Sequence, residues 1–445
     1  MSATNLSLQK PDSERKNWFV HDRFGMIIHF GLYSLHTQGA WYRSRQELPH
    51  EHILKYFNQF NPDLYDPGDW ARRARRAGMT HMTLTSKHHD GFCLWPTKET
   101  DFNVSNTPYG KDLIGPFVEA CRTEGLKVGL YYSLIDWSRR DFAIDAFHPL
   151  RNSEDLESYN AKCDVSRYQA FMKAQVTELL TQYGEISHFF PDFSYPRATH
   201  RGVSGKGRDY WDSEGLLALV RELQPNAIVN NRLDLLDIEA DFYTPECFVP
   251  HEAPLRKGRP VDFESAFTMS ERWSYNRDEQ NWKSPHQLIR VLVDMVSMGG
   301  NLMMNVGPTG RGILDKRTMA ALDAYADWME LHARSIYGCG KSPFQAPKDC
   351  RLTQNGNRVY VHLFSWPYKH LYLEGLGGKV AYAQLLNDAS EITWLPPGRR
   401  VLGEGEGLQG LDQDDLPHDI LVLQLPPAKP PVEVPVIELI LGRAP

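Results

Sequence analysis

Two acidic residues stand where their side chains could do chemistry. Asp192 interrupts the apolar run 189–193 (FFPDF), and Glu246 directly follows Pro245, which ends regular strand pairing and presents the next side chain. Two carboxyl groups that face one pocket can hydrolyse a glycosidic bond, with retention at a separation of about 5–5.5 Å and inversion at about 6.5–9.5 Å. From local sequence alone, Asp192 could instead pair with an arginine or cap a turn, and Glu246 could be an exposed turn residue.

Polar residues also follow most of the other runs that have the pattern of buried strands. They are His29, Lys87-His88-His89-Asp90-Gly91, Tyr131-Tyr132, Asn230-Asn231-Arg232 and Asn305. In a barrel of parallel strands, catalytic side chains project from the carboxyl ends of the strands. Asp192 and Glu246 are two strand–helix units apart, so both can face one pocket, and a charge such as Arg232 would keep Asp192 ionised. The set predicts a polar active site at one end of a barrel.

The pair His88-His89 could suggest a metal site, but the spacing argues against it. Adjacent residues in an extended chain point to opposite faces, and neither HxH nor HExxH is present around them. We therefore expect these histidines to hydrogen-bond a polar ligand, with core or turn histidines as the alternative, and we expect no metal and no cofactor. The arginine-rich run 72–76 is interpreted as a solvated helix face, and the glycines at 299–300, 307 and 310 as turns rather than phosphate loops.

The elements that would position these residues alternate along the first part of the chain. Strands are expected at 24–31, 81–86, 127–133, 188–193, 227–232, 241–246, 265–269 and 301–306, and helices at 69–77, 113–124, 165–183, 214–223 and 285–298. Near-continuous apolar strands separated by helices indicate a parallel sheet that is covered on both faces. Eight of them favour the α/β class and a (β/α)₈-type barrel as the catalytic domain, over residues 1–342.

After residue 337 the pattern changes to short β-type runs without helices between them. These runs are 359–364, 370–373, 380–385, 420–425 and 436–441, and they are separated by segments rich in glycine and proline. Such a pattern is typical of a small antiparallel β-sandwich. We therefore predict a C-terminal β-sandwich domain over residues 343–445, with the boundary near 342–347.

Composition excludes several classes of function. The 445 residues include 49 Lys and Arg against 56 Asp and Glu, so the net charge of −7 gives no basic field for nucleic acid. A hydrophobic content of 41% excludes a disordered chain, and no apolar run reaches the ~18 residues of a membrane span. The 11 Trp, 20 Tyr and 20 Phe suit platforms for sugar binding as well as a core.

The six cysteines and the N-terminal segment bear on the compartment. No two cysteines have CxxC spacing, which is typical of reduced, packed thiols in a reducing compartment. The first residues lack the basic-then-apolar order of a signal peptide, so we expect a cytoplasmic protein, or a periplasmic or secreted one if a leader has been removed.

Several segments together resemble the α-L-fucosidases of glycoside hydrolase family 29. They are Trp18-Phe19, 25–34 (GMIIHFGLYS), Trp41-Tyr42, 86–92 (SKHHDGF), 129–133 (GLYYS), 273–276 (WSYN) and 299–308 (GGNLMMNVGP), in the order that the family has them. The resemblance covers roughly residues 16–342. It implies an exo-acting, retaining hydrolase with a barrel and a C-terminal β-sandwich that needs no metal.

The resemblance also implies roles for individual residues. Asp192 falls at the nucleophile position, and Glu246 at the acid/base position of one branch of the family. Glu264 and Glu47 are the alternative acids, because relatives place this residue differently. The positions that hydrogen-bond the fucose hydroxyls are held here by His29, His88, His89, Tyr132 and Arg232. The positions that line the sugar are held by Trp41, Phe190 and Trp273.

Three departures from the family pattern lie near this site. Ala40 stands where some relatives carry a sugar-contacting glutamate, Phe190-Pro191 replaces a common Trp-Phe, and Phe193 follows the nucleophile where glycine is frequent. We expect an α-L-fucosidase that acts on fucosylated oligosaccharides or glycoconjugates. The alternatives are a sugar-binding protein with a degenerate site and an exo-glycosidase for α-L-galactosides; the oligomeric state is left open.

Overall fold

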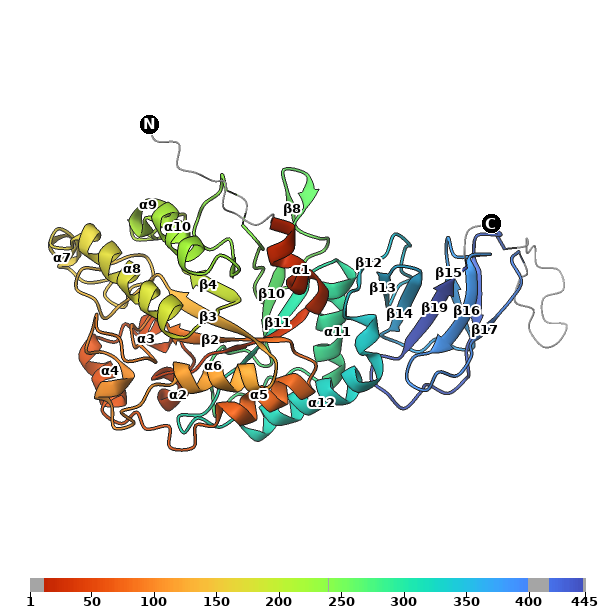
Figure 1. Cartoon of the computed structure of the whole chain (residues 1–445), viewed down its shortest axis with the longest axis horizontal. Coiled ribbons are helices and arrows are strands. Elements are labelled where there is room, and N and C mark those ends of the chain that lie inside the picture. Colours follow the sequence, from red (N-terminus) through yellow and green to blue (C-terminus); the bar gives the residue numbers. More distant parts are fainter. Residues whose placement is uncertain (1–11, 239, 399–415, 443–445) are drawn as a thin grey trace.

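The computed structural model describes residues 12–238, 240–398 and 416–442. Its largest sheet has seven parallel strands in the order β10-β11-β1-β2-β3-β4-β7 (Figure 1). The strands are β1 Phe24–Ile28, β2 His81–Lys87, β3 Lys127–Ser133, β4 His188–Asp192, β7 Ile228–Val229, β10 Glu264–Thr268 and β11 Asn301–Val306. Every residue of these strands except Lys127 is buried, which explains their near-continuous apolar sequences.

The parallel sheet has seven regular strands and does not form the closed eight-stranded barrel that was predicted. Between β7 and β10, the segment predicted as a strand at 241–246 makes only single parallel bridges, Asn230–Phe242 on one side and Tyr243–Phe263 and Glu246–Ala266 on the other. Pro245 within this segment has no N–H group to donate, so a continuous ladder cannot form there. The predicted strand at 227–232 is likewise reduced to two residues in β7. The prediction of a parallel barrel-like sheet is confirmed, and the prediction of eight regular strands is not.

Helices follow most of these strands and cover the sheet. They are α1 Asp12–Asp22, α2 Tyr33–His36, α3 Tyr42–Arg45, α4 His50–Phe57, α5 Pro67–Arg76, α6 Ile114–Thr123, α7 Leu156–Asn160, α8 Val165–Gln182, α9 Arg208–Trp211, α10 Ser213–Leu223, α11 Pro285–Ser297 and α12 Lys316–His332. The ends of the long helices follow from local sequence, as in the capping box of Ser284 and Gln287 that begins α11. In α5, Trp70 is buried while the side chains of Arg72 and Arg76 are 57% and 62% exposed, so the arginine run is a solvated helix face as predicted.

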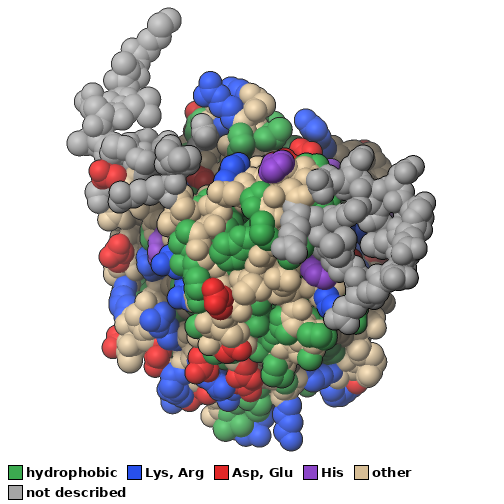
Figure 2. All heavy atoms as spheres, turned by 90° about the vertical axis from the view of Figure 1, so that its right-hand side faces the viewer, with side chains coloured by type: hydrophobic (Ala, Val, Ile, Leu, Met, Phe, Trp, Pro, Cys, Tyr) green, Lys and Arg blue, Asp and Glu red, His purple; other side chains and the backbone are tan. Residues whose placement is uncertain are grey.

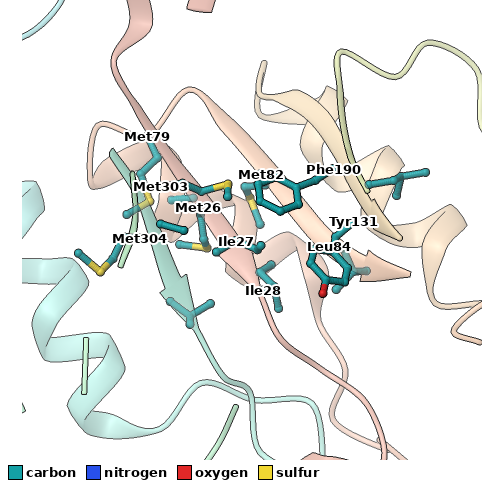
Figure 3. Close-up of a cluster of buried hydrophobic side chains, with 14 of the residues drawn as sticks. Met26, Ile27, Ile28, Met79, Met82, Leu84, Tyr131, Phe190, Met303 and Met304 are labelled. Carbon is teal, nitrogen blue, oxygen red and sulfur yellow. The ribbon is translucent and has the colours of Figure 1, made fainter. Parts of the chain in front are cut away.

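Strand register decides which side chains share a face of the parallel sheet. Met26 of β1 pairs with Met82 of β2 and Met304 of β11, so these three side chains lie on the same face of the sheet. Figure 3 shows them in the buried cluster, with Met304 directed toward a neighbouring helix. Ile27 points to the opposite face because side chains alternate along a strand. Both faces are fully packed, and Ile27 marks the face on which the functional site lies.

The C-terminal part forms two antiparallel sheets, as expected. One has the order β12-β13-β14-β19-β16 and the other β15-β18-β17. Their bounds are β12 Gly340–Lys341, β13 Cys350–Asn355, β14 Arg358–Leu363, β15 His370–Leu373, β16 Val380–Leu385, β17 Thr393–Trp394, β18 Leu421–Gln424 and β19 Val436–Leu441. One hydrophobic cluster is shared by the facing sides of both sheets. Figure 2 views this end of the molecule, where apolar side chains are interspersed with charged ones.

Short hairpins complete the chain. β5 Thr199–His200 pairs with β6 Val203–Ser204, and β8 Leu255–Arg256 pairs with β9 Arg259–Pro260. Among the described residues, no helix has both the length and the apolar character that a membrane crossing requires.

Candidate active site

A pocket opens at the carboxyl ends of the parallel strands. Its lining residues are Ile27, His29, Trp41, His88, Tyr131, Phe190, Asp192, Phe193, Tyr195, Glu246, Ala266 and Trp273. The structure thus brings together seven of the ten residues predicted for the site, from positions spread over more than 200 residues of sequence. Arg232 joins them through its contacts with both acids. His89 packs directly behind the lining, against His88 and Trp41, and Tyr132 lies elsewhere.

Asp192, the last residue of β4, is held by four hydrogen-bond donors. Its Oδ1 accepts from the backbone N–H of Phe193 at 2.8 Å, from Arg232 Nη1 at 2.9 Å and from the Tyr195 hydroxyl at 3.4 Å. Its Oδ2 accepts from the Tyr131 hydroxyl at 2.8 Å. Donors that point at a carboxylate stabilise its charged form. The side chain is therefore an oriented carboxylate. Pairing with an arginine, one of the alternatives open from the sequence, is observed here, and it occurs within the pocket.

The backbone after Asp192 is unusual. Phe193 has a φ of 85°, in the left-handed region where glycine is favoured and a residue with a side chain is strained. This conformation points the Phe193 N–H back at Asp192 Oδ1 and places the Phe193 ring 5.5 Å from those of Trp41 and His88. The departure from glycine at this position thus adds an aromatic wall to the pocket at the expense of backbone strain.

Glu246 lies beside Asp192 because one guanidinium holds both. Arg232 donates from Nη2 to Glu246 Oε2 at 2.9 Å and from Nη1 to Asp192 Oδ1, and its Nε donates to the Thr244 hydroxyl. The fork of donors on an arginine is rigid, so the two carboxyl groups face the same small volume. Burial and the nearby charge of Asp192 raise the pKa of Glu246, and together they outweigh the opposing effect of Arg232.

His29, which directly follows β1, is neutral and has a defined orientation. Burial lowers its pKa to about 4, although the hydrogen bond with Asn305 opposes this shift. Asn305 donates its amide N–H to the Trp273 carbonyl, so its Oδ1 faces His29 Nδ1 at 2.6 Å and accepts a hydrogen bond from the Nδ1–H group. The other ring nitrogen, Nε2, is then left as a hydrogen-bond acceptor on a side chain that lines the pocket.

Contrary to what their spacing predicts, the two adjacent histidines do not point to opposite faces: their ring centroids lie 4.0 Å apart, because the chain turns after β2 instead of staying extended. His88 lines the pocket, whereas His89 packs beneath it, with its ring 4.0 Å from Trp137 and 4.8 Å from Trp41. Gly91, at φ 87°, makes the turn possible, because a Cβ there would lie 2.1 Å from Asp136 Oδ1. Burial lowers the pKa of both histidines, so both are neutral. Neither ring nitrogen of His89 has a hydrogen-bond partner among the described residues.

The prediction for Tyr132 is corrected by the structure. Its hydroxyl donates to Gln175 Oε1 at 2.8 Å and accepts from Lys87 Nζ at 3.0 Å, on the face of β3 that points away from the pocket. The preceding residue, Tyr131, has the position expected for Tyr132: its ring stacks 5.6 Å from Phe190, its partner in the register, and its hydroxyl reaches Asp192. Because side chains alternate along β3, only one of the two tyrosines can face the pocket. It is Tyr131, which pairs in register with Phe190, another residue of the pocket lining.

Neither alternative acid lies at the pocket. Glu264 begins β10, at the opposite end of the sheet, where it is fully buried with His81 at 3.0 Å and His188 at 3.2 Å. The ligand atoms of these three side chains lie within 4.8 Å of one another, which is close enough for a small cation, but none of the three lines the pocket. Glu47 binds Asn152 at 2.5 Å and Arg151 at 3.4 Å. It belongs neither to the pocket lining nor to the cluster around Glu264.

Aromatic residues complete the pocket as predicted. Trp273 lies with its ring 5.2 Å from His29, Trp41 packs against Phe193, and Phe190 forms part of the floor. Tyr195 was not predicted; its hydroxyl binds both Arg232 and Asp192, and the only sequence signal for it is its place three residues after the acid. Ala40 is 4% exposed and contributes no polar group here.

Comparison with known proteins agrees with this geometry. The family model described as Alpha-L-fucosidase matches residues 2–334. The chain belongs to the alpha-L-fucosidase family. It is therefore a glycoside hydrolase, and the resemblance found in the sequence is confirmed.

Solved structures and curated proteins of this family match over almost the whole chain. Alpha-L-fucosidase isoenzyme 1 from Paenibacillus thiaminolyticus is 38% identical with a TM-score of 0.87, covering 97% of this chain and 99% of that one. A GH29 alpha-L-fucosidase from Bacteroides thetaiotaomicron, trapped as a covalent intermediate with 2-fluoro-fucosyl fluoride, is 27% identical with a TM-score of 0.80 and covers 99% and 98%. Tissue alpha-L-fucosidase from Bos taurus is 26% identical over 94% of this chain and 86% of its own length.

Proposed function

We propose that the protein is a retaining exo-α-L-fucosidase that releases terminal L-fucose from fucosylated oligosaccharides or glycoconjugates. The observation that carries this proposal is the Arg232 guanidinium, which binds Asp192 and Glu246 at one small pocket. Two carboxyl groups in different environments are what double displacement requires: one ionised as the nucleophile and one protonated as the acid.

In the first step, Asp192 attacks the anomeric carbon. Its Oδ1 is held by three donors and Oδ2 by Tyr131 alone, so Oδ2 is the freer oxygen for bond formation. As the bond from the anomeric carbon to the leaving oxygen breaks, Glu246 donates its proton to that oxygen. The raised pKa of Glu246 favours the protonated form that this step needs.

In the second step, the role of Glu246 reverses. Once Asp192 is esterified, its negative charge is lost, and with it one of the two causes that raise the pKa of Glu246. Glu246 can then remain a carboxylate beside Arg232 and take a proton from water. The water attacks the anomeric carbon, the ester bond to Asp192 breaks, and fucose leaves as the α anomer.

The apolar part of the pocket supports fucose as the sugar. Fucose has a methyl group at C6 where galactose has a hydroxymethyl group, and Trp41, Phe190, Phe193 and Trp273 provide aromatic surface. An added hydroxyl against an apolar wall changes kcat/KM by about 10–200-fold. We expect a preference of this size for α-L-fucosides over α-L-galactosides; equal kcat/KM for the two would contradict a methyl-selective wall.

The decisive experiment is hydrolysis of an aryl α-L-fucoside followed by NMR of the first-formed sugar. Release of the aryl group and initial formation of the α anomer are expected. An initial β anomer would mean inversion and a different use of the two acids. No release of fucose from any fucoside would favour the alternative of a sugar-binding protein.

A further inference from the structure

Three titratable side chains that the mechanism does not use meet inside the parallel sheet. His81, His188 and Glu264 are the first residues of β2, β4 and β10, and all three are fully buried. His188 and Glu264 stand two residues before Phe190 and Ala266, which line the active-site pocket. Side chains two residues apart on a strand share a face. The cluster therefore lies on the same face of the sheet as the pocket, in the layer beneath it.

The spacing of the polar atoms suits a bound metal ion. His81 Nε2 lies 3.0 Å from Glu264 Oε1, and His188 Nε2 lies 3.2 Å from Glu264 Oε2. Neighbouring ligand atoms in a tetrahedral zinc site, with bonds of about 2.0–2.2 Å, are about 3.3 Å apart. Because each oxygen of Glu264 faces one imidazole, the carboxylate can bind an ion through both oxygens. The cluster then offers four donor atoms without a water molecule.

His81 lacks the hydrogen bonds that a buried imidazole normally makes. Among the described residues, neither its Nδ1 nor its Nε2 has a hydrogen-bond partner, although the side chain is only 1% exposed. The opposite atom, Glu264 Oε1, also lacks a hydrogen-bond donor within the described part of the chain. Buried polar atoms are costly when they are left unpaired. An ion that binds both atoms would satisfy them together.

The surroundings hold the two imidazoles in place. The Thr83 hydroxyl lies 3.1 Å from His188 Nδ1, and when the Nδ1–H group donates to it, Nε2 keeps its electron pair for a metal. The His81 ring occupies the space beside Gly25, where a Cβ would lie 2.1 Å from the ring. The ring of Trp18 packs edge-on against His81 at 5.5 Å. The histidines are therefore fixed before an ion binds.

The chemistry of the cluster selects the kind of ion. A carboxylate in a dry interior needs a compensating positive charge, and a divalent cation supplies it at Glu264. Two imidazoles and one carboxylate are a ligand set that zinc accepts, whereas calcium and magnesium prefer oxygen ligands alone. The four donor atoms leave no open position for a substrate. The ion would therefore be structural.

The cluster also spans the weakest part of the parallel sheet. β7 and β10 are its two edge strands, and the segment between them makes only single bridges. His188 lies in β4, the neighbour of β7, and Glu264 begins β10. An ion that binds both side chains links the two sides of this gap, where backbone hydrogen bonds are few.

We propose that His81, His188 and Glu264 bind one zinc ion, which ties β10 to β2 and β4 beneath the pocket. This site is separate from the catalytic carboxyl groups and takes no part in hydrolysis. The three residues lie far apart in the sequence, so no short motif of metal ligands reveals it.

The first test measures metal content. Because the site is fully buried, the ion must enter during folding, so the full-length protein is expressed in medium with zinc and then dialysed against a chelator. Elemental analysis should find one zinc ion per chain in the wild-type protein, and less than about 0.2 in His81→Gln and His188→Gln. The matched control is His332→Gln, since His332 is also fully buried with an unpartnered Nε2 but lies outside the cluster; it should keep the zinc.

Cobalt provides a second readout that does not depend on stability. Protein expressed with Co²⁺ in place of zinc should show the visible absorption of tetrahedral cobalt. His81→Cys should keep the metal, because a thiolate also binds zinc and cobalt, and should add a sulfur-to-cobalt charge-transfer band in the near ultraviolet. This variant decides the question if His81→Gln does not fold.

Three outcomes would overturn the zinc site. They are a folded wild-type protein without bound zinc, zinc that remains in both Gln variants, and a metal-loaded His81→Cys without the charge-transfer band. Hydrolysis of fucosides is not a readout of these experiments, so their failure would leave the proposed function standing.

Discussion

At the scale of single residues, the site is organised around Arg232, which binds two carboxyl groups that must differ in protonation. The side-chain surroundings of the two acids differ in the required sense. Among the described residues, Asp192 accepts four hydrogen bonds and is largely enclosed, while Glu246 accepts from Arg232 alone; the Glu246 side chain is partly buried and 39% exposed. A carboxyl group open to the substrate side suits proton transfer to a leaving oxygen, and an enclosed, fully oriented one suits attack.

The first prediction concerns the nucleophile. Asp192→Asn keeps the size of the side chain and a carbonyl oxygen that can accept from Phe193 and Arg232, so the fold should remain. An amide cannot form the covalent intermediate, and kcat should fall by about 10³-fold or more. Steady-state kinetics with an aryl fucoside, together with circular dichroism of the variant, check this. Near-normal turnover of a folded variant would show that another group attacks.

The second prediction concerns the acid. Glu246→Ala should slow the hydrolysis of natural fucosides far more than the fucosylation step with a nitrophenyl fucoside, whose leaving group departs without protonation. Deglycosylation should also slow, and added azide should restore it by attacking without help from a base. The measurement is kcat/KM for both substrates, with and without azide.

The pH profile provides an independent check of the same assignment. Glu246 must be protonated to act as an acid, so kcat/KM for a natural fucoside should fall as pH rises through its pKa, which burial and Asp192 raise. In Glu246→Gln this alkaline limb should disappear. If azide rescues a variant of Glu47 and not of Glu246, the acid is misassigned and the two-carboxylate mechanism stands.

At the scale of elements, the register of the strands separates catalysis from stability. The sequence left Glu246, Glu264 and Glu47 as possible acids. Glu264 begins β10, whereas Glu246 ends the neighbouring segment 241–246. Residues at the amino ends of parallel strands stabilise a barrel, and those at the carboxyl ends react. Burial alone would raise the pKa of Glu264, but His81 and His188 outweigh it and lower the pKa to about 2.

The third prediction follows from this pKa. A carboxyl group whose pKa is lower in the folded state than in the unfolded state stabilises the folded state. This contribution is complete at pH values above the unfolded pKa of about 4.3, and it is lost as pH falls toward the folded pKa of about 2. Glu264→Gln should therefore lower the free energy of unfolding by about 3–5 kcal/mol near neutral pH, and by less at acid pH. Urea unfolding at several pH values measures this, with the exposed Glu330→Gln as control.

Activity measurements on the same variant separate stability from catalysis. The folded fraction of Glu264→Gln should hydrolyse aryl and natural fucosides in the same ratio as the wild-type protein, and azide should have no effect. A changed ratio with unchanged stability would return Glu264 to the list of possible acids.

At the scale of the whole molecule, the sequence predicted the parallel sheet, the antiparallel C-terminal part and most of the pocket. It predicted them because apolar strands and their polar ends recur with a regular spacing. It did not distinguish Tyr131 from Tyr132, because the register between β2 and β3 shifts between these two residues: Tyr131 pairs with Thr85 and Tyr132 with Lys87. It also missed β13, whose sequence CRLTQN mixes polar and apolar residues without the apolar run that marks the other strands.

The division of the chain at residue 342 stays a prediction, and the packing of β19 bears on it. Side chains alternate along this strand: Ile437 and Leu439 belong to the cluster between the C-terminal sheets, whereas Val436 belongs to the cluster of the catalytic part. Glu438, on the same face as Val436, is fully buried and pairs with Arg334 at 3.2 Å, just after α12. Strand β19 is thus buried on both faces, and the face that carries Val436 and Glu438 packs on the catalytic part.

The last prediction follows from this shared core. Val436→Asp places an unpaired charge in a fully buried position, which costs several kcal/mol, and the loss should reach the active site because the same cluster includes Phe190 and Phe193. We expect a lower midpoint of thermal unfolding, with activity and tryptophan fluorescence lost in one transition. Tyr372→Asp, on a side chain that is 44% exposed in the outer sheet, is the matched control and should leave the midpoint nearly unchanged. If Val436→Asp melts the C-terminal sheets at a lower temperature while activity persists, the two parts are independent folding units and the shared core does not couple them.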